Sequence, residues 1–572
     1  MNFLPTLSSR FLTLLFAALA AQSCGPGGVQ PAAAPSPPPS EPPPVEAGIP
    51  AAPGEYALAV DIQHYDIELA LGAPTVQGRV DIQLATGGAT ELPLDFTGLA
   101  VAEVTVDGEQ TEFQYEAGKL RVPLPAGSTS ANVGVRYEGT PDDGLIIRPN
   151  VHGNPAVFVD NWPNRTRFWL PTVDHPGDKA TASFTAHAPA EWQVIANGAQ
   201  VGEPTPADAS ALGGPDGKRT WRWATQVLHP TYTLVFGATE FRVQSLGRSA
   251  CGNAPASQGA DGCVDVSMWV YPEDAAFGAQ VFDRAPEMMD FFTDLIGPYP
   301  FEKLANVQSA TRFGGMENSS AIFYSEQAMA SGQLSEGTVS HEIAHQWFGD
   351  SATQTEWSQL WLSEGFATYF GALFFEEADG TDDFRNRMET ARQSYLRSGV
   401  TGLPVVGPAP ANLFQLLNAN SYEKGGWVLH MLRGLVGDEA FFEGIRRYYA
   451  TYAFGNATTD DLREVMEGAA DRPLDWFFQQ WVFEPGYPVL ESEWEWDDAN
   501  SEVVVTIRQT QVADWPTFRL PITIEIHAGE TRQTAQLEVT SRSETFRLPS
   551  AAQATDVVLD PAGQILRGPP GA

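Results

Sequence analysis

The sequence predicts a multidomain α+β protein with a β-rich N-terminal domain, a mainly helical central domain and a small C-terminal β-sandwich. After a proline-rich segment about 520 residues remain, and a chain of that length usually forms several domains, here about three. Stretches in which apolar and polar residues alternate lie on both sides of a long region with helical periodicity. We expect the domains to comprise residues 54–246, 247–486 and 487–572.

The first 24 residues have the pattern of a signal peptide. Arg10 precedes an apolar run from Phe11 to Ala21, and small residues follow that run. The run is too short to span a bilayer. Cys24 lies where a bacterial lipoprotein signal places its lipidated cysteine. We therefore expect an exported protein that is either anchored to a membrane of the cell envelope through Cys24 or released into the periplasm or the medium.

Residues 25–53 are rich in proline and predict a semi-rigid tether without a core of its own. From residue 54 onward, alternating segments such as "YDIELALG", "VDIQLA", "VAEVTVDG" and "LRVPLP" are separated by turn residues. This pattern continues to residue 245 and predicts the β-rich domain.

Cys251 and Cys263 lie in the loop-like stretch "CGNAPASQGADGC". In an exported protein we expect these cysteines to form one disulfide that closes a surface loop. A role as metal ligands is disfavoured, because no histidine or further cysteine lies nearby.

The central region contains "HEIAHQWFGD", residues 341–350, in a chain with only 9 histidines. On an α-helix, positions four apart share one face, so His341 and His345 can direct ring nitrogens at one point. Glu342 lies beside the pair and can reach a water at a bound metal. An apolar row on the opposite side predicts packing on a core: Val339, Ile343 and Trp347.

A catalytic zinc usually takes three protein ligands and leaves one position open. The stretch "WSQLWLSEGFATYFGALFFEEA", residues 357–378, predicts a second helix. A turn between the two helices can bring Glu364 beside the histidines. We expect one Zn²⁺ per chain, bound by His341, His345 and Glu364. The alternative is a pair of core histidines and a solvated carboxylate.

The pattern H-E-x-x-H, 18 residues and then E resembles the gluzincin metallopeptidases, with a spacing similar to that of aminopeptidase N and leukotriene hydrolase. "FGGMENSS", residues 313–320, resembles the exopeptidase signature of that family, and "NSYEKGG", residues 420–426, resembles its tyrosine segment. The resemblance extends from about residue 54 to the end of the sequence. It implies a thermolysin-like catalytic domain. Larger members have a further helical domain, so we expect a short bacterial form with a more open cleft.

The resemblance also implies roles for the segment around residue 315. Glu317 would anchor the free α-amine of a peptide, because a buried ammonium group needs a charged partner. Gly314 and Gly315 would offer main-chain groups to an extended peptide. Met316 and Asn318 would complete this substrate-binding segment.

The implied reaction is hydrolysis of the first peptide bond of a substrate. Zinc activates a water, and Glu342 acts as the general base and then passes the proton to the leaving amine. Tyr422 would donate a hydrogen bond to the oxyanion. In many relatives a glutamine also contacts the amine, but the corresponding stretch here is "DNWPNRTR", residues 160–167. Asn161 or Asn164 could replace that glutamine.

After "EPGYPVL" the sequence returns to strand patterns, among them "EVVVTIRQ", "LPITIEIHAG" and "TAQLEVTS". These segments predict the small β-sandwich.

A formal net charge of −38 disfavours binding to nucleic acids or to anionic lipid surfaces. The family resemblance implies peptides with a free N-terminus as partners, and the expected contact with a membrane is limited to a lipid on Cys24.

Two other functions remain open from the sequence. A thermolysin-like zinc endopeptidase would use the same ligands without an amine anchor. An inactive binding scaffold of the same fold would have no use for Glu342 or Tyr422. The motifs also leave room for epoxide hydrolysis, which is known for one branch of the family.

Overall fold

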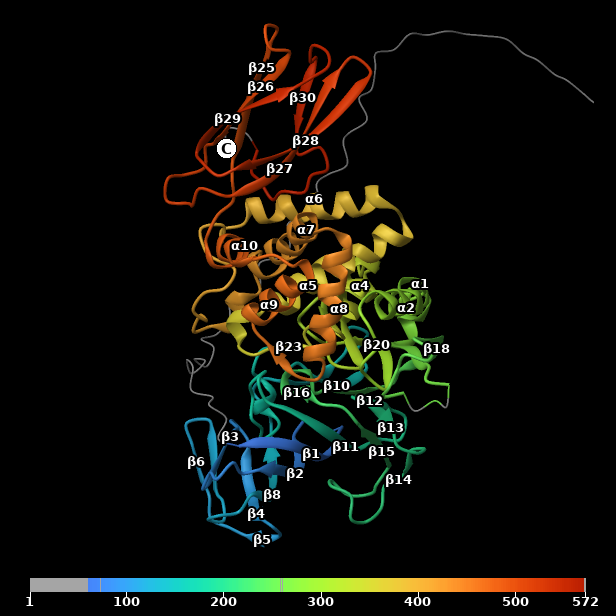
Figure 1. Ribbon diagram of the computed structural model, residues 1–572. Coiled ribbons are helices and arrows are strands. Elements are labelled where there is room, and N and C mark those ends of the chain that lie inside the picture. Colours follow the sequence, from blue (N-terminus) through green and yellow to red (C-terminus); the bar gives the residue numbers. More distant parts are fainter. Residues whose placement is uncertain (1–59, 73, 258, 260, 570–572) are drawn as a thin grey trace, which may run out of the picture. The chain divides into compact units, whose positions relative to one another are not determined.

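The computed structural model describes residues 60–569, except residues 73, 258 and 260 (Figure 1). The expected signal peptide, the tether and Cys24 lie outside the described residues. Among the described helices, none combines the length and the apolar content needed to cross a bilayer.

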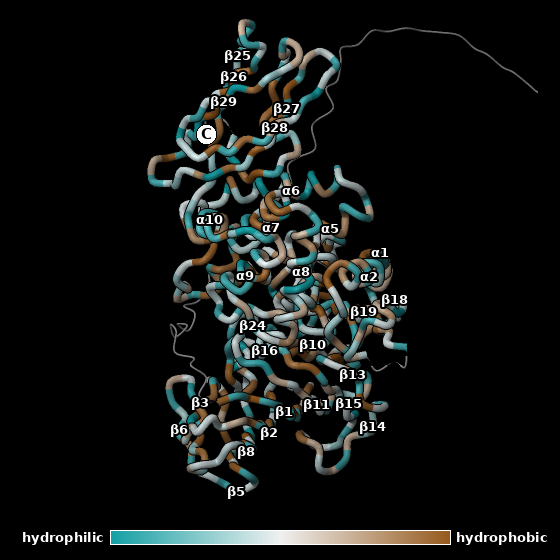
Figure 2. Tube along the Cα trace, viewed as in Figure 1, coloured by the Kyte–Doolittle hydropathy of each residue, from teal (hydrophilic) through white to brown (hydrophobic). Residues whose placement is uncertain are grey.

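The N-terminal domain is built from β-sheets, which confirms the predicted fold class. Its largest sheet has the strand order β13-β15-β11-β1-β2-β8-β4-β5, with β14 paired to β15 and β16 to β11. Buried and accessible residues alternate along β2, as expected of a sheet with one face on a core. Figure 2 shows the hydropathy of each residue along the chain. The strands are β1 (Asp61–Ala70), β2 (Val76–Ala85), β4 (Ala100–Val106), β5 (Glu109–Gln110), β8 (Ser130–Gly139), β11 (Lys179–Pro189), β13 (Ala199–Gln200), β14 (Thr205–Pro206), β15 (Lys218–Ala224) and β16 (His229–Pro230).

Two smaller sheets belong to the same domain, with the orders β12-β17-β10-β9 and β3-β7-β6. Their strands are β3 (Glu91–Asp95), β6 (Gln114–Glu116), β7 (Lys119–Pro123), β9 (Leu145–Pro149), β10 (Pro155–Val159), β12 (Gln193–Ala196) and β17 (Phe236–Thr239). A 3₁₀ turn at Thr166–Phe168 and another at Thr231–Thr233 connect these strands to their neighbours.

The central domain contains a sheet that the helical periodicity did not reveal. Its order is β18-β19-β20-β22-β21, and β19, β20 and β22 are parallel. β18 extends across the expected domain boundary at 246–247, because it pairs along its length with β19. The disulfide between Cys251 and Cys263 lies in the β18–β19 connection. The strands are β18 (Arg242–Ser249), β19 (Val264–Val270), β20 (Lys303–Ser309), β21 (Gly315–Met316) and β22 (Ala321–Ser325).

Helices form the rest of the central domain, together with the short strand pair β23 (Thr353–Gln354) and β24 (Asn456–Ala457). The helices are α1 (Ala275–Val281), α2 (Ala285–Leu295), α3 (Glu326–Ala330), α4 (Glu336–His345), α5 (Trp361–Ala378), α6 (Thr381–Arg397), α7 (Gly425–Val436), α8 (Asp438–Tyr452), α9 (Thr459–Ala470) and α10 (Asp475–Phe478). Short 3₁₀ turns cover Pro272–Asp274, Trp357–Gln359 and Leu413–Leu416, and π-helical turns cover Asn420–Lys424 and Gln479–Phe483.

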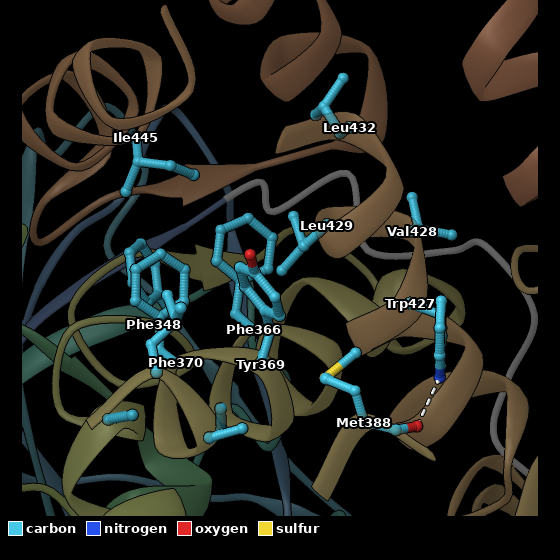
Figure 3. Packing of buried hydrophobic residues seen from close by; sticks show 14 of the residues in the cluster. Phe348, Phe366, Tyr369, Phe370, Met388, Trp427, Val428, Leu429, Leu432 and Ile445 are labelled. Atoms are coloured by element: carbon cyan, nitrogen blue, oxygen red, sulfur yellow. Dashed lines mark hydrogen bonds between the residues drawn. The ribbon is translucent and has the colours of Figure 1, made fainter. Parts of the chain in front are cut away.

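Helices α4 and α5 pack against each other and against an aromatic core. The predicted apolar row of α4 is completely buried. Beyond the end of α4, the ring of Phe348 packs on Phe366 and Phe370 of α5, with centroid distances of 4.6 and 5.0 Å (Figure 3). Most residues of α5 are buried on every side, which is typical of a helix at the centre of a domain. The core therefore fixes both helices relative to each other.

The C-terminal region forms two small antiparallel sheets, with the orders β25-β26-β29 and β28-β27-β30. The strands are β25 (Leu490–Asp497), β26 (Glu502–Gln509), β27 (Leu520–Ala528), β28 (Thr531–Val539), β29 (Ser543–Pro549) and β30 (Asp556–Leu559).

Helices α5 and α7 touch backbone to backbone at two glycines. A Cβ atom built on Gly365 would lie 2.8 Å from the Cα of Gly425, and one built on Gly425 would lie 2.9 Å from the Cα of Gly365. The absence of both side chains therefore sets the position of α5, which carries Glu364.

The variant Gly365→Ala is expected to be less stable than the wild type, because its methyl group meets backbone that cannot move aside. Overpacking of this kind costs about 1–3 kcal/mol. The matched control is Gly468→Ala in α9, where a Cβ atom would have nothing within 4 Å and where helix propensity favours alanine by roughly 0.5–1 kcal/mol. Urea denaturation midpoints compare the two. Equal midpoints would contradict the proposed close packing.

Candidate metal centre

Three nitrogen and oxygen atoms from α4 and α5 converge on one point. The Nε2 atoms of His341 and His345 are 3.1 Å apart. Oε2 of Glu364 lies 3.3 Å from Nε2 of His341 and 3.2 Å from Nε2 of His345. The structure thus brings together the three side chains that the sequence predicted as metal ligands.

This triangle fits a tetrahedral zinc ion. Zinc binds histidine nitrogen and carboxylate oxygen at about 2.0–2.2 Å, which places neighbouring tetrahedral ligands roughly 3.3–3.6 Å apart. The observed separations lie at or slightly below this range. Three protein ligands leave a fourth position for water or substrate, as in catalytic rather than structural zinc sites.

The outer nitrogen of His345 fixes the orientation of its ring. Nδ1 lies 3.0 Å from the carbonyl oxygen of Phe348 and 3.0 Å from Oγ of Ser363. Because a carbonyl oxygen can only accept, Nδ1 carries a hydrogen and Nε2 is left for a metal. Gly349 follows directly, with φ +118, and a Cβ there would lie 2.3 Å from Oγ of Ser363. The turn after α4 thus supports the ligand.

The charges of the site favour a cation. The ligand atoms of Glu317, Glu342 and His345 lie within 4.8 Å of one another, and Glu364 is also close. Burial by itself would lower the pKa of His345, but the charges of Glu364 and Glu317 outweigh it and raise that pKa to about 10. Burial by itself would raise the pKa of Glu364, but the charge of His345 outweighs it and lowers that pKa to about 2. Carboxylates that hold a proton on a buried imidazole would equally stabilise a divalent cation at Nε2.

Glu342 lies beside the histidines and is packed against Gly315. A Cβ atom on Gly315 would lie 2.1 Å from Oε1 of Glu342. Residue 315 must therefore be glycine for the carboxylate to occupy its place. Burial raises the pKa of Glu342 well above its ordinary value, so this group binds a proton more readily than an exposed glutamate.

Glu317 follows strand β21 and is 5% exposed. Its Oε1 atom is buried without a hydrogen-bond partner among the described residues. Burial, aided by the charge of Glu364, raises the pKa of Glu317 to about 7 although His345 opposes the shift. A buried carboxylate oxygen without a partner is costly, and a ligand that brings a cationic donor would satisfy it.

Tyr422 approaches the centre from a π-helical turn, Asn420–Lys424, which leads into α7. Its hydroxyl donates to Oε1 of Glu364 over 2.8 Å, and its ring is nearly parallel to that of His341, with a centroid distance of 6.0 Å. π-Helical turns often occur at functional sites. The phenol therefore lies at the metal residues and can donate a hydrogen bond there.

These groups surround a cavity of about 200 Å³. Gly314 and Met316 line it, whereas Asn318 is buried and does not. The expected roles of Asn161 and Asn164 are not supported, because neither lines the cavity. The lining residues are Trp162, Phe313, Gly314, Gly315, Met316, Glu317, His341, Glu342, His345, Glu364, Leu417 and Tyr422.

Asn161 has both ends of its side chain engaged elsewhere. Its Nδ2 donates to the carbonyl oxygen of Leu234 over 2.6 Å, and its Oδ1 accepts from Nε1 of Trp169 over 2.8 Å. Trp162 takes the place beside the cavity instead. Its ring packs against Phe313 and Phe414, with centroid distances of 6.0 and 5.6 Å. The cavity wall is therefore aromatic at this point and does not present an amide.

Gln346 is a further residue of the site that the sequence did not indicate. Its Nε2 donates to the carbonyl oxygen of Glu317 over 2.9 Å and to Oδ2 of Asp350 over 2.8 Å. Its Oε1 accepts from the backbone N–H of Ser320 over 2.8 Å. Because Gln346 directly follows His345, it ties the segment that carries Glu317 to the helix that carries the histidines.

Two family models match the sequence of this chain. The Peptidase M1 N-terminal domain matches residues 61–233, and the Peptidase family M1 domain matches residues 281–481. The chain belongs to peptidase family M1. Membership of this family implies zinc, and the three converging side chains have the chemistry and spacing to hold such an ion.

Known relatives agree with this assignment. The chain is 28% identical to aminopeptidase N of Streptomyces lividans, over 80% of this chain and 54% of that protein. It is 27% identical to a probable aminopeptidase 2 of Sulfurisphaera tokodaii, over 75% of this chain and 54% of that protein. The chain thus spans about half the length of the curated relatives it matches.

Solved structures of family members are similar as well. The M1 zinc metallopeptidase from Deinococcus radiodurans is 26% identical with a TM-score of 0.61, and the match covers 74% of this chain and 93% of that one. Legionella pneumophila aminopeptidase A, solved with aspartic acid, has a TM-score of 0.76 at 17% identity, over 90% of this chain and 60% of that one. The latter likeness concerns the fold alone.

The variant Gly315→Ala is expected to displace the carboxylate of Glu342 while leaving the three ligands untouched. The zinc content should then equal that of the wild type, and the hydrolysis of an aminoacyl anilide, the activity proposed below, should be about 10²-fold slower, since a displacement of ~1 Å can have an effect of that size. The control is Gly468→Ala in α9, because a Cβ there would have nothing within 4 Å and residue 468 does not line the cavity. Zinc content by mass spectrometry and kcat/KM are the measurements. Equal losses in both variants would contradict the proposed contact.

Proposed function

We propose that this protein is a zinc-dependent aminopeptidase that removes N-terminal residues from peptides. The observation that carries the proposal is the buried, unpartnered Oε1 of Glu317 in the same cavity as the three ligand atoms. A free α-ammonium group would supply both the charge and the hydrogen bonds that this oxygen lacks. The names of the aminopeptidase relatives support the same function.

In the proposed hydrolysis, the zinc ion and Glu342 would activate the attacking water. A bound zinc ion, one per chain, would supply Lewis acidity and lower the pKa of a water to about 7. Glu342, buried beside the ligands, would take the proton of that water and later deliver it to the leaving amine. The raised pKa of Glu342 suits this exchange, because a carboxyl group that binds protons readily can both accept and return one.

Tyr422 and Glu317 would position the substrate. The hydroxyl of Tyr422 donates to Glu364 in this structure and would donate to the oxyanion during the reaction. Glu317 would hold the amine so that only the first peptide bond reaches Glu342. Gln346 would keep Glu317 at a fixed depth through its bond to the carbonyl of that residue. This arrangement accounts for an exopeptidase rather than an endopeptidase.

We also propose that the protein acts outside the cytoplasm. The sequence pattern of residues 1–24 supports export, and Cys24 supports attachment to a membrane of the cell envelope. Its substrates would then be peptides of the periplasm or the surroundings.

An aminoacyl anilide with a free amine is expected to be hydrolysed at least about 10²-fold faster than its N-acetylated form, because acetylation removes the charge that Glu317 binds. The variant Glu317→Gln should lower this ratio toward one and raise KM for the free amine. Steady-state kinetics on both substrates measure the ratio. Equal rates in the wild type would contradict the amine anchor and would indicate an endopeptidase.

The variant Tyr422→Phe is expected to lower kcat by about 10²–10³-fold, as the loss of one oxyanion donor usually does. Its zinc content and KM should change little, because the phenol is not a ligand. Kinetics and metal analysis of the same preparation test this. A variant with unchanged kcat would remove Tyr422 from its proposed role.

A further inference from the structure

A second cavity adjoins the metal centre. It has a volume of about 560 Å³, and His341 and Tyr422 line both cavities. Most of its other lining comes from one face of α6. The complete lining is His341, Thr368, Asp383, Asn386, Arg387, Thr390, Ala391, Ser394, Tyr422 and Glu423.

The position of this cavity suits the leaving part of a peptide. Glu317 lines the first cavity but not the second. A peptide whose amine lies at Glu317 must extend past the metal residues in the other direction. His341 and Tyr422 line both spaces, so the groove along α6 adjoins the metal residues on a side that Glu317 does not line, and the chain beyond the scissile bond would lie there.

The charges of the groove are unequal. Asp383 and Arg387 form an ion pair with each other, and the guanidinium group of Arg387 also lies 3.5 Å from the centroid of the Phe375 ring. These two charges therefore compensate each other. The remaining charged residue is Glu423. It accepts a hydrogen bond from Oγ of Ser394 over 2.7 Å, and within the part of the chain that the structure describes it has no ion-pair partner.

The backbone holds Glu423 at this place. It follows Tyr422 in the π-helical turn Asn420–Lys424, so the residue that donates at the metal centre and the carboxylate of the groove are neighbours. The next residue, Lys424, does not neutralise Glu423, because its buried ammonium group donates to the carbonyl oxygen of Glu484 over 3.2 Å. Asn386, Thr390 and Ser394 add only neutral polar groups.

We infer that the groove along α6 binds the leaving part of the peptide and that Glu423 selects a lysine or arginine there. This inference rests on the proposed aminopeptidase function and names its substrate class: peptides with a basic residue at position two or three. The half-buried carboxylate would pair with the cation, while Asn386 and Thr390 would hydrogen-bond to the backbone of the peptide.

The test compares tetrapeptides that share their first residue and carry lysine, glutamine or glutamate at position two or three. We expect the wild type to have a kcat/KM about 5- to 20-fold higher for lysine than for glutamate at one of these positions, as a partly buried ion pair allows. Glu423→Gln should bring this ratio within about twofold of one, and Glu423→Lys should invert it. The ratio does not depend on the fraction of active enzyme.

The control is Asp382→Asn. Asp382 precedes the groove residue Asp383 on α6, but its side chain is 97% exposed and does not line the groove. This control matters because a net charge of −38 attracts any cation. The ratio in Asp382→Asn should equal that of the wild type. In the wild type, 1 M salt should compress the ratio, because it screens a half-exposed pair.

Two results would overturn the inference: a wild type without a preference for lysine over glutamate, or an equal loss of preference in Glu423→Gln and Asp382→Asn. Neither result would affect the proposed function if free amines were still required. Equal hydrolysis of free and acetylated anilides would overturn the proposed function itself, so the two failures are distinguishable.

Discussion

The packing of α5 against α4 is the constraint on which the site depends. His341 and His345 share a face of α4, but they complete a three-ligand centre only if α5 brings Glu364 to the same point. Glycines permit the close approach on both sides of α5. A Cβ on Gly371 would lie 3.1 Å from the Cα of His341, and Gly365 touches α7. A methyl group on Gly371 would push α5 away from α4 and separate the ligands, and one on Gly365 would push α5 away from α7.

The same packing buries the charges and gives them their chemistry. Glu317, Glu342 and Glu364 all lie close to His345 at a point where water is largely excluded. A cluster of buried carboxylates is unstable without a cation. This accounts for the strongly raised pKa of His345, whose protonated ring supplies a positive charge. A metal ion would supply the positive charge at Glu364, and the ammonium group of a substrate would supply it at Glu317. The electrostatics of the cavity thus match both a metal ion and a peptide end.

The sequence predicted the fold class and the residues that converge, because short-range spacing determines both. Two histidines four apart on a helix must share a face. Once both helices pack on one core, the packing leaves few positions for the glutamate of the next helix. The sequence did not predict the sheet β18–β22, because helices and loops separate its strands along the chain. Asn161 appeared suited to the amine because its residue type is right, yet tertiary hydrogen bonds engage it and leave Trp162 at the cavity. Besides the nearby side chain of Asp350, Gln346 contacts the backbone of Glu317 and Ser320, which are distant in sequence, and the sequence contains no pattern that predicts such contacts.

The central claim is that His341, His345 and Glu364 hold one zinc ion between α4 and α5. X-ray diffraction from crystals of the purified protein, measured on both sides of the zinc absorption edge, tests it most directly. We expect a single anomalous peak about 2.0–2.2 Å from the two Nε2 atoms and from Oε2 of Glu364, with a fourth position open to solvent. A peak coordinated without Glu364, or a zinc-loaded crystal with no peak between the two helices, would contradict the account.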